Sequence, residues 1–130
     1  MIETYSLPKI IFGTSSLGNL FVELDNETKE QLVQAAVGSG SGIPVFDSAG
    51  KYGAGLALES LAAGLKALNV APDAVKISNK LGWKRVELTT SEPTFEPGAW
   101  INLKYDAVQD ISYQGILECY LQGNDLLGDY

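Results

Sequence analysis

The sequence predicts an α/β fold built around a parallel sheet, and three observations support this prediction. Strand-like and helix-like segments alternate along the chain at a period of roughly 30 residues, which favours right-handed βαβ units. The segment at residues 43–46 is continuously apolar rather than alternating, as in strands buried on both faces. Polar residues follow each strand-like segment directly, as in the loops at the carboxyl ends of parallel strands.

The first strand and helix are expected before residue 41. Residues 9–12 are apolar and β-branched and end at a polar loop, which predicts a short strand. A helix is expected at residues 27–37, where acidic residues occupy the first turn. Its cap is Asp25 or Asn26, its end is Gly38 or Gly40, and its apolar stripe is Leu32, Val33, Ala36 and Val37.

A second strand–helix unit follows. The strand at residues 43–46 places Asp47 at its end. An amphipathic helix is expected at residues 55–69 and is ended by Pro72. Its apolar positions recur at intervals of three and four: Leu58, Leu61, Ala62, Leu65 and Leu68. Residues 75–78 form the third expected strand, and it is followed by Asn79 and Lys80.

The last third of the chain has a weaker pattern. Residues 81–110 contain Pro93, Pro97, Gly98 and Trp100 without clear periodicity, so a long loop is expected, and such loops are usually functional or disordered. Ser112 can cap a final helix that residues 123–125 break. The expected apolar face of that helix comprises Ile116, Leu117, Tyr120 and Leu121.

Among α/β folds, the barrel is favoured. A doubly wound dinucleotide fold would carry a Gly-x-Gly-x-x-Gly turn after the first strand, and residues 12–18 read Phe-Gly-Thr-Ser-Ser-Leu-Gly instead. In a barrel, chemistry is located at the carboxyl ends of the strands. The expected strand ends here are residues 13–16, 47–53 and 79–83.

Composition excludes several classes of protein. The 130 residues are 45% hydrophobic, and no apolar run approaches the roughly 20 residues that cross a bilayer. One domain without a membrane span or a secretory signal is therefore expected, in the cytoplasm. The net charge of −7 argues against nucleic acid and anionic membranes as partners. A group of four cations, interpreted as a solvated rim, comprises Lys76, Lys80, Lys84 and Arg85.

The absence of histidine and the single cysteine, Cys119, restrict the chemistry further. An internal disulfide, a Ser-His-Asp triad and a histidine-ligated metal are excluded, and no metal site is expected.

Three side chains can converge at the strand ends: Asp47, Tyr52 and Lys80. An ammonium beside a phenol favours the ionised form of the phenol, and a carboxylate favours the charged ammonium. Such a trio would donate a proton to a carbonyl oxygen. Structural interpretations remain open for each: Asp47 as a cap or turn former, Tyr52 as a packed aromatic residue and Lys80 as a surface cation.

The same residues belong to a familiar pattern. Residues 45–53 read Val-Phe-Asp-Ser-Ala-Gly-Lys-Tyr-Gly, Glu59 follows on the next helix, and Lys80-Leu81-Gly82 closes a strand. This arrangement resembles the aldo-keto reductase family, and the resemblance runs over most of the chain. Residues 11–21 look most like the branch of sugar 1-dehydrogenases that includes fucose, galactose and threo-aldose dehydrogenases.

The resemblance implies a (β/α)8 TIM barrel, of which residues 1–130 would be a single partial domain with about three βα units. It implies hydride transfer between NADP or NAD and an aldose or another carbonyl or alcohol compound. Tyr52 would be the general acid or base, Lys80 would favour its ionised form, and Asp47 would hold Lys80.

The resemblance also implies binding residues. Gly13, Thr14, Ser15 and Asp47 would lie beside the nicotinamide ribose. Trp83 and Tyr52 would contact the substrate, because aromatic faces pack on sugar rings. Trp83 as a loop anchor is the alternative.

The chain departs from the family in two respects. The family's fourth catalytic residue is a histidine after the fourth strand, and this chain has none. The residues that bind the cofactor's phosphates lie in later strands of the barrel. Activity of these 130 residues alone is therefore not expected.

The alternative function is an inactive barrel fragment that acts as an oligomerising or binding module. Self-association is expected because open sheet edges are unpaired.

Overall fold

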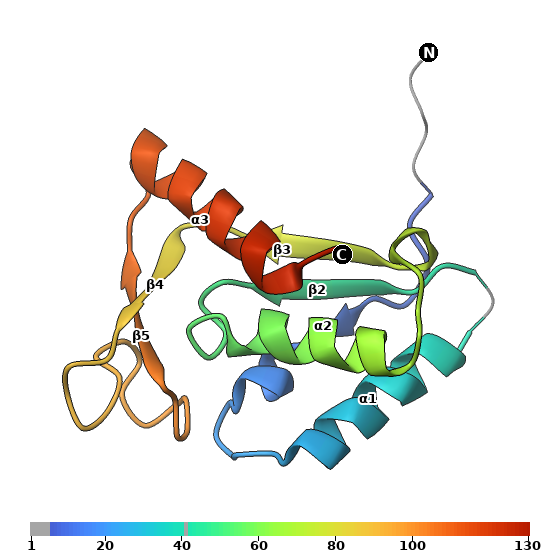
Figure 1. Cartoon of the computed structure of the whole chain (residues 1–130), viewed down its shortest axis with the longest axis horizontal. Helices are drawn as coiled ribbons and strands as arrows, with labels where there is room; N and C mark the ends of the chain where they lie inside the picture. Colours follow the sequence, from blue (N-terminus) through green and yellow to red (C-terminus); the bar gives the residue numbers. More distant parts are fainter. Residues whose placement is uncertain (1–5, 41) are drawn as a thin grey trace.

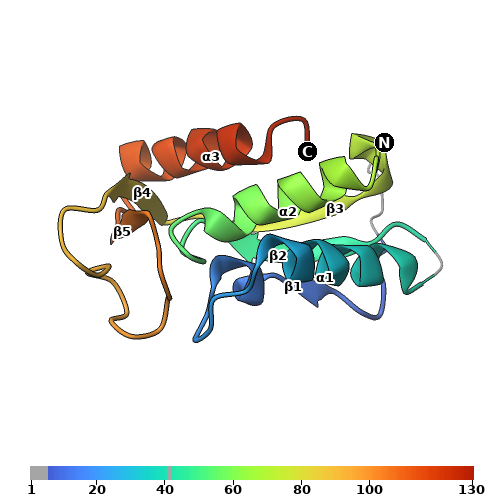
Figure 2. The ribbon, with the colours of Figure 1, turned by 60° about the horizontal axis from the view of Figure 1, so that its bottom comes forward.

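The computed structural model describes residues 6–40 and 42–130. Three parallel strands form the main sheet in the order β1-β2-β3, namely β1 (Phe12–Gly13), β2 (Val45–Ala49) and β3 (Lys76–Lys80). Helices α1 (Asn26–Gly38), α2 (Leu56–Ala67) and α3 (Tyr113–Leu127) all lie on one face of this sheet (Figures 1 and 2). The prediction of the α/β class is confirmed. The sheet is open, with helices on one face as in a segment of a barrel wall.

The strands differ from the expected ones in their bounds. The first is shorter, because only Phe12 and Gly13 pair with β2, while Ile10 and Ile11 are exposed. The second and third continue beyond their apolar residues to Ala49 and Lys80. Parallel pairing joins backbone groups and does not require apolar side chains, so it includes Asp47, which was expected just after the strand.

The core lies between the sheet and the first two helices. Phe46 of β2 and Ile77 of β3 are register partners, so their side chains share the face that meets the helices. They pack against apolar residues of α1 and α2, including Val33, Leu61 and Leu65. The predicted cap of α1 is confirmed: the Asp25 carboxylate accepts a hydrogen bond of 2.7 Å from the Thr28 amide.

The expected loop at residues 81–110 instead contains an antiparallel hairpin. Strand β4 (Trp83–Glu87) pairs with β5 (Tyr105–Gln109), from Trp83 opposite Gln109 to Glu87 opposite Tyr105. The hairpin lies beyond the carboxyl ends of β2 and β3, at the left of Figure 1. The loop expectation was wrong because these strands carry charged residues on partly exposed faces, which hides the usual alternation.

Helix α3 begins as predicted but continues further. Ser112 caps it by accepting a 3.0 Å hydrogen bond from the Gly115 amide. The expected break at residues 123–125 is absent, because Gly123 lies inside the helix where it meets β3. A Cβ atom on Gly123 would be 2.6 Å from Asn79 Nδ2.

The buried face of α3 was also predicted incorrectly. Small residues allow the helix to approach the sheet closely, and the buried positions are Gly115, Cys119, Gly123 and Leu127. Leu117, Tyr120 and Leu121 of the expected apolar face are exposed.

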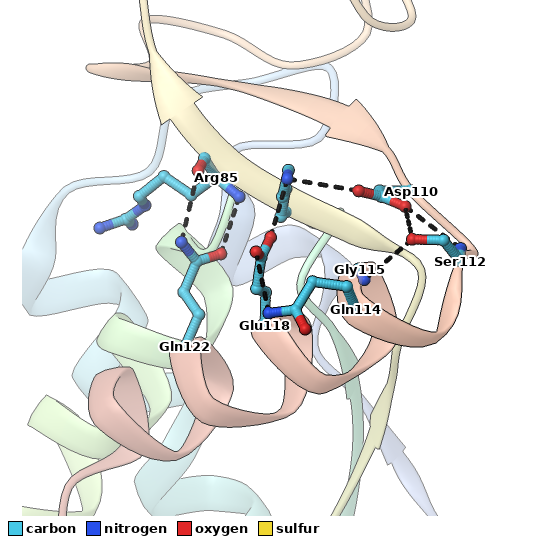
Figure 3. A network of polar contacts seen from close by, with 8 residues as sticks. Arg85, Asp110, Ser112, Gln114, Gly115, Glu118 and Gln122 are labelled. Atoms are coloured by element: carbon cyan, nitrogen blue, oxygen red, sulfur yellow. Dashed lines mark hydrogen bonds and ion pairs between the residues drawn. The ribbon is translucent and has the colours of Figure 1, made fainter.

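Polar contacts attach the hairpin to α3 (Figure 3). The Lys84 ammonium lies 2.8 Å from the Glu118 carboxylate and 3.3 Å from that of Asp110. The Arg85 amide donates a 2.7 Å hydrogen bond to Gln122, whose side-chain amide donates back to the Arg85 carbonyl at 3.3 Å. In residues 6–40 and 42–130, no helix is both long and apolar enough to cross a membrane.

Candidate active site

Asp47 and Lys80 approach each other because of the register between β2 and β3. Asp47 is paired with Ser78, and Lys80 lies two residues further along β3, so all three share one face of the sheet. Phe46 and Ile77 occupy the other face, toward the helices. The Lys80 ammonium lies 2.7 Å from Asp47 Oδ2 and also donates a 3.0 Å hydrogen bond to the Ser48 carbonyl.

The environment of Lys80 favours its charged form. Burial by itself lowers the pKa of this lysine, but its interactions with Asp47 and Tyr52 outweigh burial and raise that pKa above the ordinary value. Lys80 is therefore a fixed positive charge at neutral pH.

Tyr52 lies in the turn between β2 and α2. Its amide donates to the Ala49 carbonyl at 3.1 Å, and its carbonyl accepts from the Ala57 amide at 3.2 Å. The Lys80 ammonium lies 4.9 Å from the centroid of the Tyr52 ring. The structure thus brings the carboxylate, the ammonium and the phenol together.

Two glycines allow the Tyr52 turn to pack against the loop after β1. A Cβ on Gly18 would be 2.7 Å from the Tyr52 carbonyl carbon, and one on Gly53 would be 2.5 Å from the Gly18 oxygen. Gly53 also has a φ of 64°. Any larger residue at either position would push the two loops apart.

The predicted cofactor residues lie beside Asp47. Gly13 is its register partner on β1 and is exposed, and Ser15 begins a short 3₁₀ helix, Ser15–Gly18. Thr14 is buried, and both its amide and its hydroxyl donate to the Asp47 carbonyl, at 3.1 and 3.0 Å. Thr14 therefore holds the backbone of Asp47, and its hydroxyl is already occupied.

Four aromatic rings form a cluster beside Lys80. Trp83 is tilted against Phe95 with ring centroids 5.9 Å apart, and Phe95 stacks on Trp100 at 6.2 Å. Trp100 in turn stacks on Tyr52 at 5.8 Å. No role for Trp100 is expected from the sequence, because nothing in an aperiodic segment shows which rings fold back on the strand ends.

A pair of charges borders this aromatic cluster. The Lys51 ammonium forms an ion pair with Glu96 and lies 4.9 Å from the centroid of the Trp83 ring. The other Glu96 oxygen accepts a 2.8 Å hydrogen bond from the Trp100 indole. The segment between β4 and β5 is thus attached to the turn that carries Tyr52.

Glu59 connects the same turn to the hairpin. Its carboxylate is ion-paired with Arg85, whose Nε donates a 2.7 Å hydrogen bond to the Ala54 carbonyl. The Arg85 guanidinium lies 4.1 Å from the centroid of the Tyr105 ring. These contacts give Glu59 a structural role in holding the Tyr52 turn against β4.

Comparisons with known proteins agree with this architecture. The sequence profile of the aldo/keto reductase family matches residues 9–128. A search of curated proteins found no match. Among solved structures, a glycerol dehydrogenase from Gluconobacter oxydans is similar with a TM-score of 0.62 and 19% identity, over 90% of this chain and 31% of that one. This chain therefore spans less than a third of that enzyme's length, and at this identity the similarity concerns the fold.

Proposed function

Because the chain belongs to the aldo/keto reductase family, we propose that it carries the proton-transfer residues of an NAD(P)-dependent oxidoreductase. The substrate of the whole protein would be an aldose or another small carbonyl or alcohol compound. The observation that supports this proposal is the cluster of Asp47, Lys80 and Tyr52 at the carboxyl ends of β2 and β3. Action in the cytoplasm stays a prediction.

Each of the three residues has a separate part in the proposed chemistry. Tyr52 donates its phenolic proton to the carbonyl oxygen during reduction and removes a proton from the alcohol during oxidation. Lys80 stabilises the phenolate that forms when the proton leaves. Asp47 keeps the Lys80 ammonium charged and oriented through their 2.7 Å contact. No histidine of this chain can assist, because it has none.

The described residues fit one end of a nicotinamide cofactor. Asp47 Oδ2 is engaged by Lys80, and no hydrogen bond to Asp47 Oδ1 is found in the described residues, so this oxygen is suited to a ribose hydroxyl. Gly13 lies beside it, exposed and without a side chain. Lys51 and Lys80 are engaged in ion pairs, so neither is proposed to bind the phosphates. The nicotinamide supplies or accepts the hydride when it is bound.

The sugar substrate is the finer part of the proposal. Trp83 is partly exposed at the start of β4, and Tyr52 is partly exposed nearby, so an apolar sugar face could pack on either ring. The choice of an aldose as substrate follows only from the resemblance to sugar 1-dehydrogenases.

The test is the substitution Tyr52→Phe in a polypeptide that also contains the rest of the barrel. We expect aldose-dependent reduction of NAD(P) to fall by about 10²–10⁴-fold, because the proton donor is lost. Cofactor affinity measured by fluorescence titration should change little. The exposed Tyr113 supplies the control substitution Tyr113→Phe. Unchanged turnover in Tyr52→Phe would reject the proposal.

The 130-residue chain alone is expected to bind NADP(H) negligibly.

One observation favours the second candidate function, an inactive fragment that associates with itself or with a partner. Five large apolar side chains on α3 and just before it are exposed: Ile111, Tyr113, Leu117, Tyr120 and Leu121. A surface of this kind is typical of an interaction site. Redox activity of the longer polypeptide would support the oxidoreductase and contradict the inactive fragment.

A further inference from the structure

Trp100 lies directly against the proposed proton donor. Its indole stacks on the Tyr52 ring with centroids 5.8 Å apart and planes inclined by 30°. Trp100 is only 5% exposed, so its ring packs against other side chains and is not accessible to a substrate. We infer that Trp100 is a positioning residue that holds the Tyr52 phenol beside the Lys80 ammonium. The inference rests on the proposed function in that Tyr52 is the residue whose position matters.

The indole is held by contacts that return to Tyr52. Trp100 Nε1 donates a 2.8 Å hydrogen bond to Glu96, and Glu96 is ion-paired with Lys51. Lys51 directly precedes Tyr52 in the chain. The contacts therefore form a closed circuit of Lys51, Glu96, Trp100 and Tyr52, in which the ring can shift only if another contact breaks.

The charge state of Glu96 supports this circuit. The hydrogen bond from Lys51 is the largest cause that lowers the pKa of the Glu96 carboxyl, and the Trp100 indole lowers it further. Glu96 is consequently ionised at neutral pH, as a strong acceptor for the indole N–H requires.

The backbone of Trp100 is held independently of its side chain. Trp100 forms a bridge with Leu20, in the loop after β1. The Phe21 amide donates to the Ala99 carbonyl at 2.6 Å, and the Ile101 amide donates to the Asn19 carbonyl at 3.0 Å. The residues on both sides of Trp100 are therefore fixed to the segment that leads from the predicted ribose loop.

Backbone strain is concentrated around the same contacts. Four residues other than glycine have positive φ there, namely Asn19 at 63°, Phe21 at 60°, Glu96 at 44° and Asn102 at 53°. Such conformations persist only where the surrounding structure imposes them, and they concentrate at functional sites. The backbone on both sides of Trp100 is therefore held in uncommon conformations, together with the hydrogen bonds to Ala99 and Asn19.

Precise placement of the phenol has a direct chemical consequence. Proton transfer requires the phenolic oxygen within hydrogen-bond distance of the reacting oxygen, and a small displacement of a catalytic group greatly slows the reaction. Tyr52 lies in a turn rather than in a strand, so its backbone alone restrains the ring less than Lys80 is restrained by β3. Stacking on Trp100 supplies the missing restraint.

The experiment measures the placement of the ring without any cofactor. In the 130-residue chain, nuclear Overhauser effects between the Tyr52 ring and the Lys80 side chain report their contact, with signals assigned by Tyr52→Phe. Trp100→Leu keeps an apolar side chain but removes the stack, and we expect the Tyr52–Lys80 effect to fall by half or more. Trp100→Phe keeps an aromatic face, so we expect its Tyr52–Lys80 effect to be close to that of the unsubstituted chain. The Phe12–Phe46 contact, at 5.8 Å between ring centroids, reports that the sheet is intact.

A second substitution covers the case in which Trp100→Leu does not fold. Glu96→Ala removes the acceptor of the indole N–H, and we expect the Trp100 indole proton signal to shift and the Tyr52–Lys80 effect to weaken. An unchanged Tyr52–Lys80 effect in either folded variant overturns the inference. Absence of redox activity in a longer polypeptide would reject the proposed function alone, because the Overhauser measurement does not depend on hydride transfer.

Discussion

At the scale of single residues, the candidate site depends on one parallel register. Side chains two positions apart on a strand point to the same face, so pairing Asp47 with Ser78 places Lys80 diagonally beside Asp47. A slip of one residue would turn Lys80 toward the helices and leave the Asp47 carboxylate without its cation. The packing of Phe46 and Ile77 on the helix side opposes such a slip, because a shift of one residue would turn Ile77 away from the core that surrounds the buried Phe46.

The contact between Asp47 and Lys80 predicts a measurable change in lysine ionisation. Burial lowers the pKa of Lys80, and Asp47 and Tyr52 raise it above the ordinary value. In Asp47→Asn, part of the raising influence is lost, so we expect the pKa of Lys80 to fall. Titration of the lysine Cε signal by NMR measures this change. Asp73→Asn, at the opposite end of β3, removes the same charge as a control and should leave Lys80 unaffected. Equal pKa values in the two variants would contradict the role of Asp47.

Asp106 predicts how stability depends on pH. Burial raises the pKa of this carboxyl, but hydrogen bonds from Thr94 and from the Ala107 amide outweigh burial and lower the pKa below the ordinary value. A carboxyl group whose pKa is lower in the folded state stabilises the protein above its unfolded pKa of about 3.9. That stabilisation is lost as the pH falls through the folded pKa.

We therefore expect urea denaturation of the chain to show falling stability between about pH 5 and pH 2. In Asp106→Asn the fall should be smaller, because this titrating group is absent. The variant should also be less stable near neutral pH by about 1–3 kcal/mol, since it replaces charge-assisted hydrogen bonds from Thr94. A variant with the same acid dependence as the parent would show that Asp106 does not contribute.

At the scale of elements, the sequence predicted those parts whose signals are local. Helix α1 begins at its predicted cap because an aspartate side chain can satisfy the free amides of its first turn. The hairpin was missed because its pairing joins residues about twenty positions apart, and short polar strands carry little periodicity. The buried face of α3 was missed because a helix packed through Gly115, Cys119 and Gly123 has its close contacts at small residues, which a search for large apolar side chains ignores.

The same distinction applies to the candidate site. The proximity of Asp47, Tyr52 and Lys80 could be predicted because Asp47 lies in a recognisable strand, Tyr52 follows that strand and Lys80 ends the next one. Trp100 could not be predicted, because its contact with Tyr52 depends on how residues 88–104 fold back. The occupied hydroxyl of Thr14 likewise depends on a backbone contact between β1 and β2 that no sequence pattern shows.

The packing of α3 on β3 predicts opposite effects for two glycine substitutions. Gly123→Ala would place a Cβ 2.6 Å from Asn79 Nδ2, so the Asn79 side chain must move, and we expect a loss of about 1 kcal/mol in unfolding free energy. Gly38→Ala, at the end of α1, meets nothing within 4 Å and should be neutral or stabilising by up to about 1 kcal/mol. Chemical denaturation measures both. A stabilising Gly123→Ala would contradict the close contact between Gly123 and the Asn79 side chain.

At the scale of the whole molecule, the two faces of the sheet have different roles, since one carries the helices and the other carries the candidate site. The three helices cover one face, while Asp47 and Lys80 lie on the other, and the hairpin folds past the strand ends beside them (Figure 1). The Arg85 and Lys84 contacts attach the hairpin to α2 and α3, so these two members of the expected solvated rim are engaged in ion pairs instead. The hairpin, whose connecting segment carries the Trp100 ring that stacks on Tyr52, is consequently attached to two of the helices that pack on the sheet.

The exposed face of α3 leads to the last prediction, which concerns association. Leu117 and Leu121 lie one turn apart and are 40% and 57% exposed, and Tyr120 lies between them in the chain and is also exposed. Water contact with this surface is unfavourable, so we propose that chains associate through it in solution. Light scattering should give an average mass that rises with protein concentration above that of the 13.9 kDa monomer.

A pair of matched variants tests whether α3 is the surface responsible. In the double variant Leu117→Lys and Leu121→Lys, the average mass should fall toward the monomer at every concentration, because burying two ammonium groups in an interface is costly. Leu32→Lys is the control, since Leu32 is 44% exposed but lies on α1. It should associate like the parent, and all variants should keep the same far-ultraviolet circular dichroism. If Leu32→Lys dissociates the chains and the α3 variant does not, the contact lies on the α1 side, and the exposed face of α3 has another role.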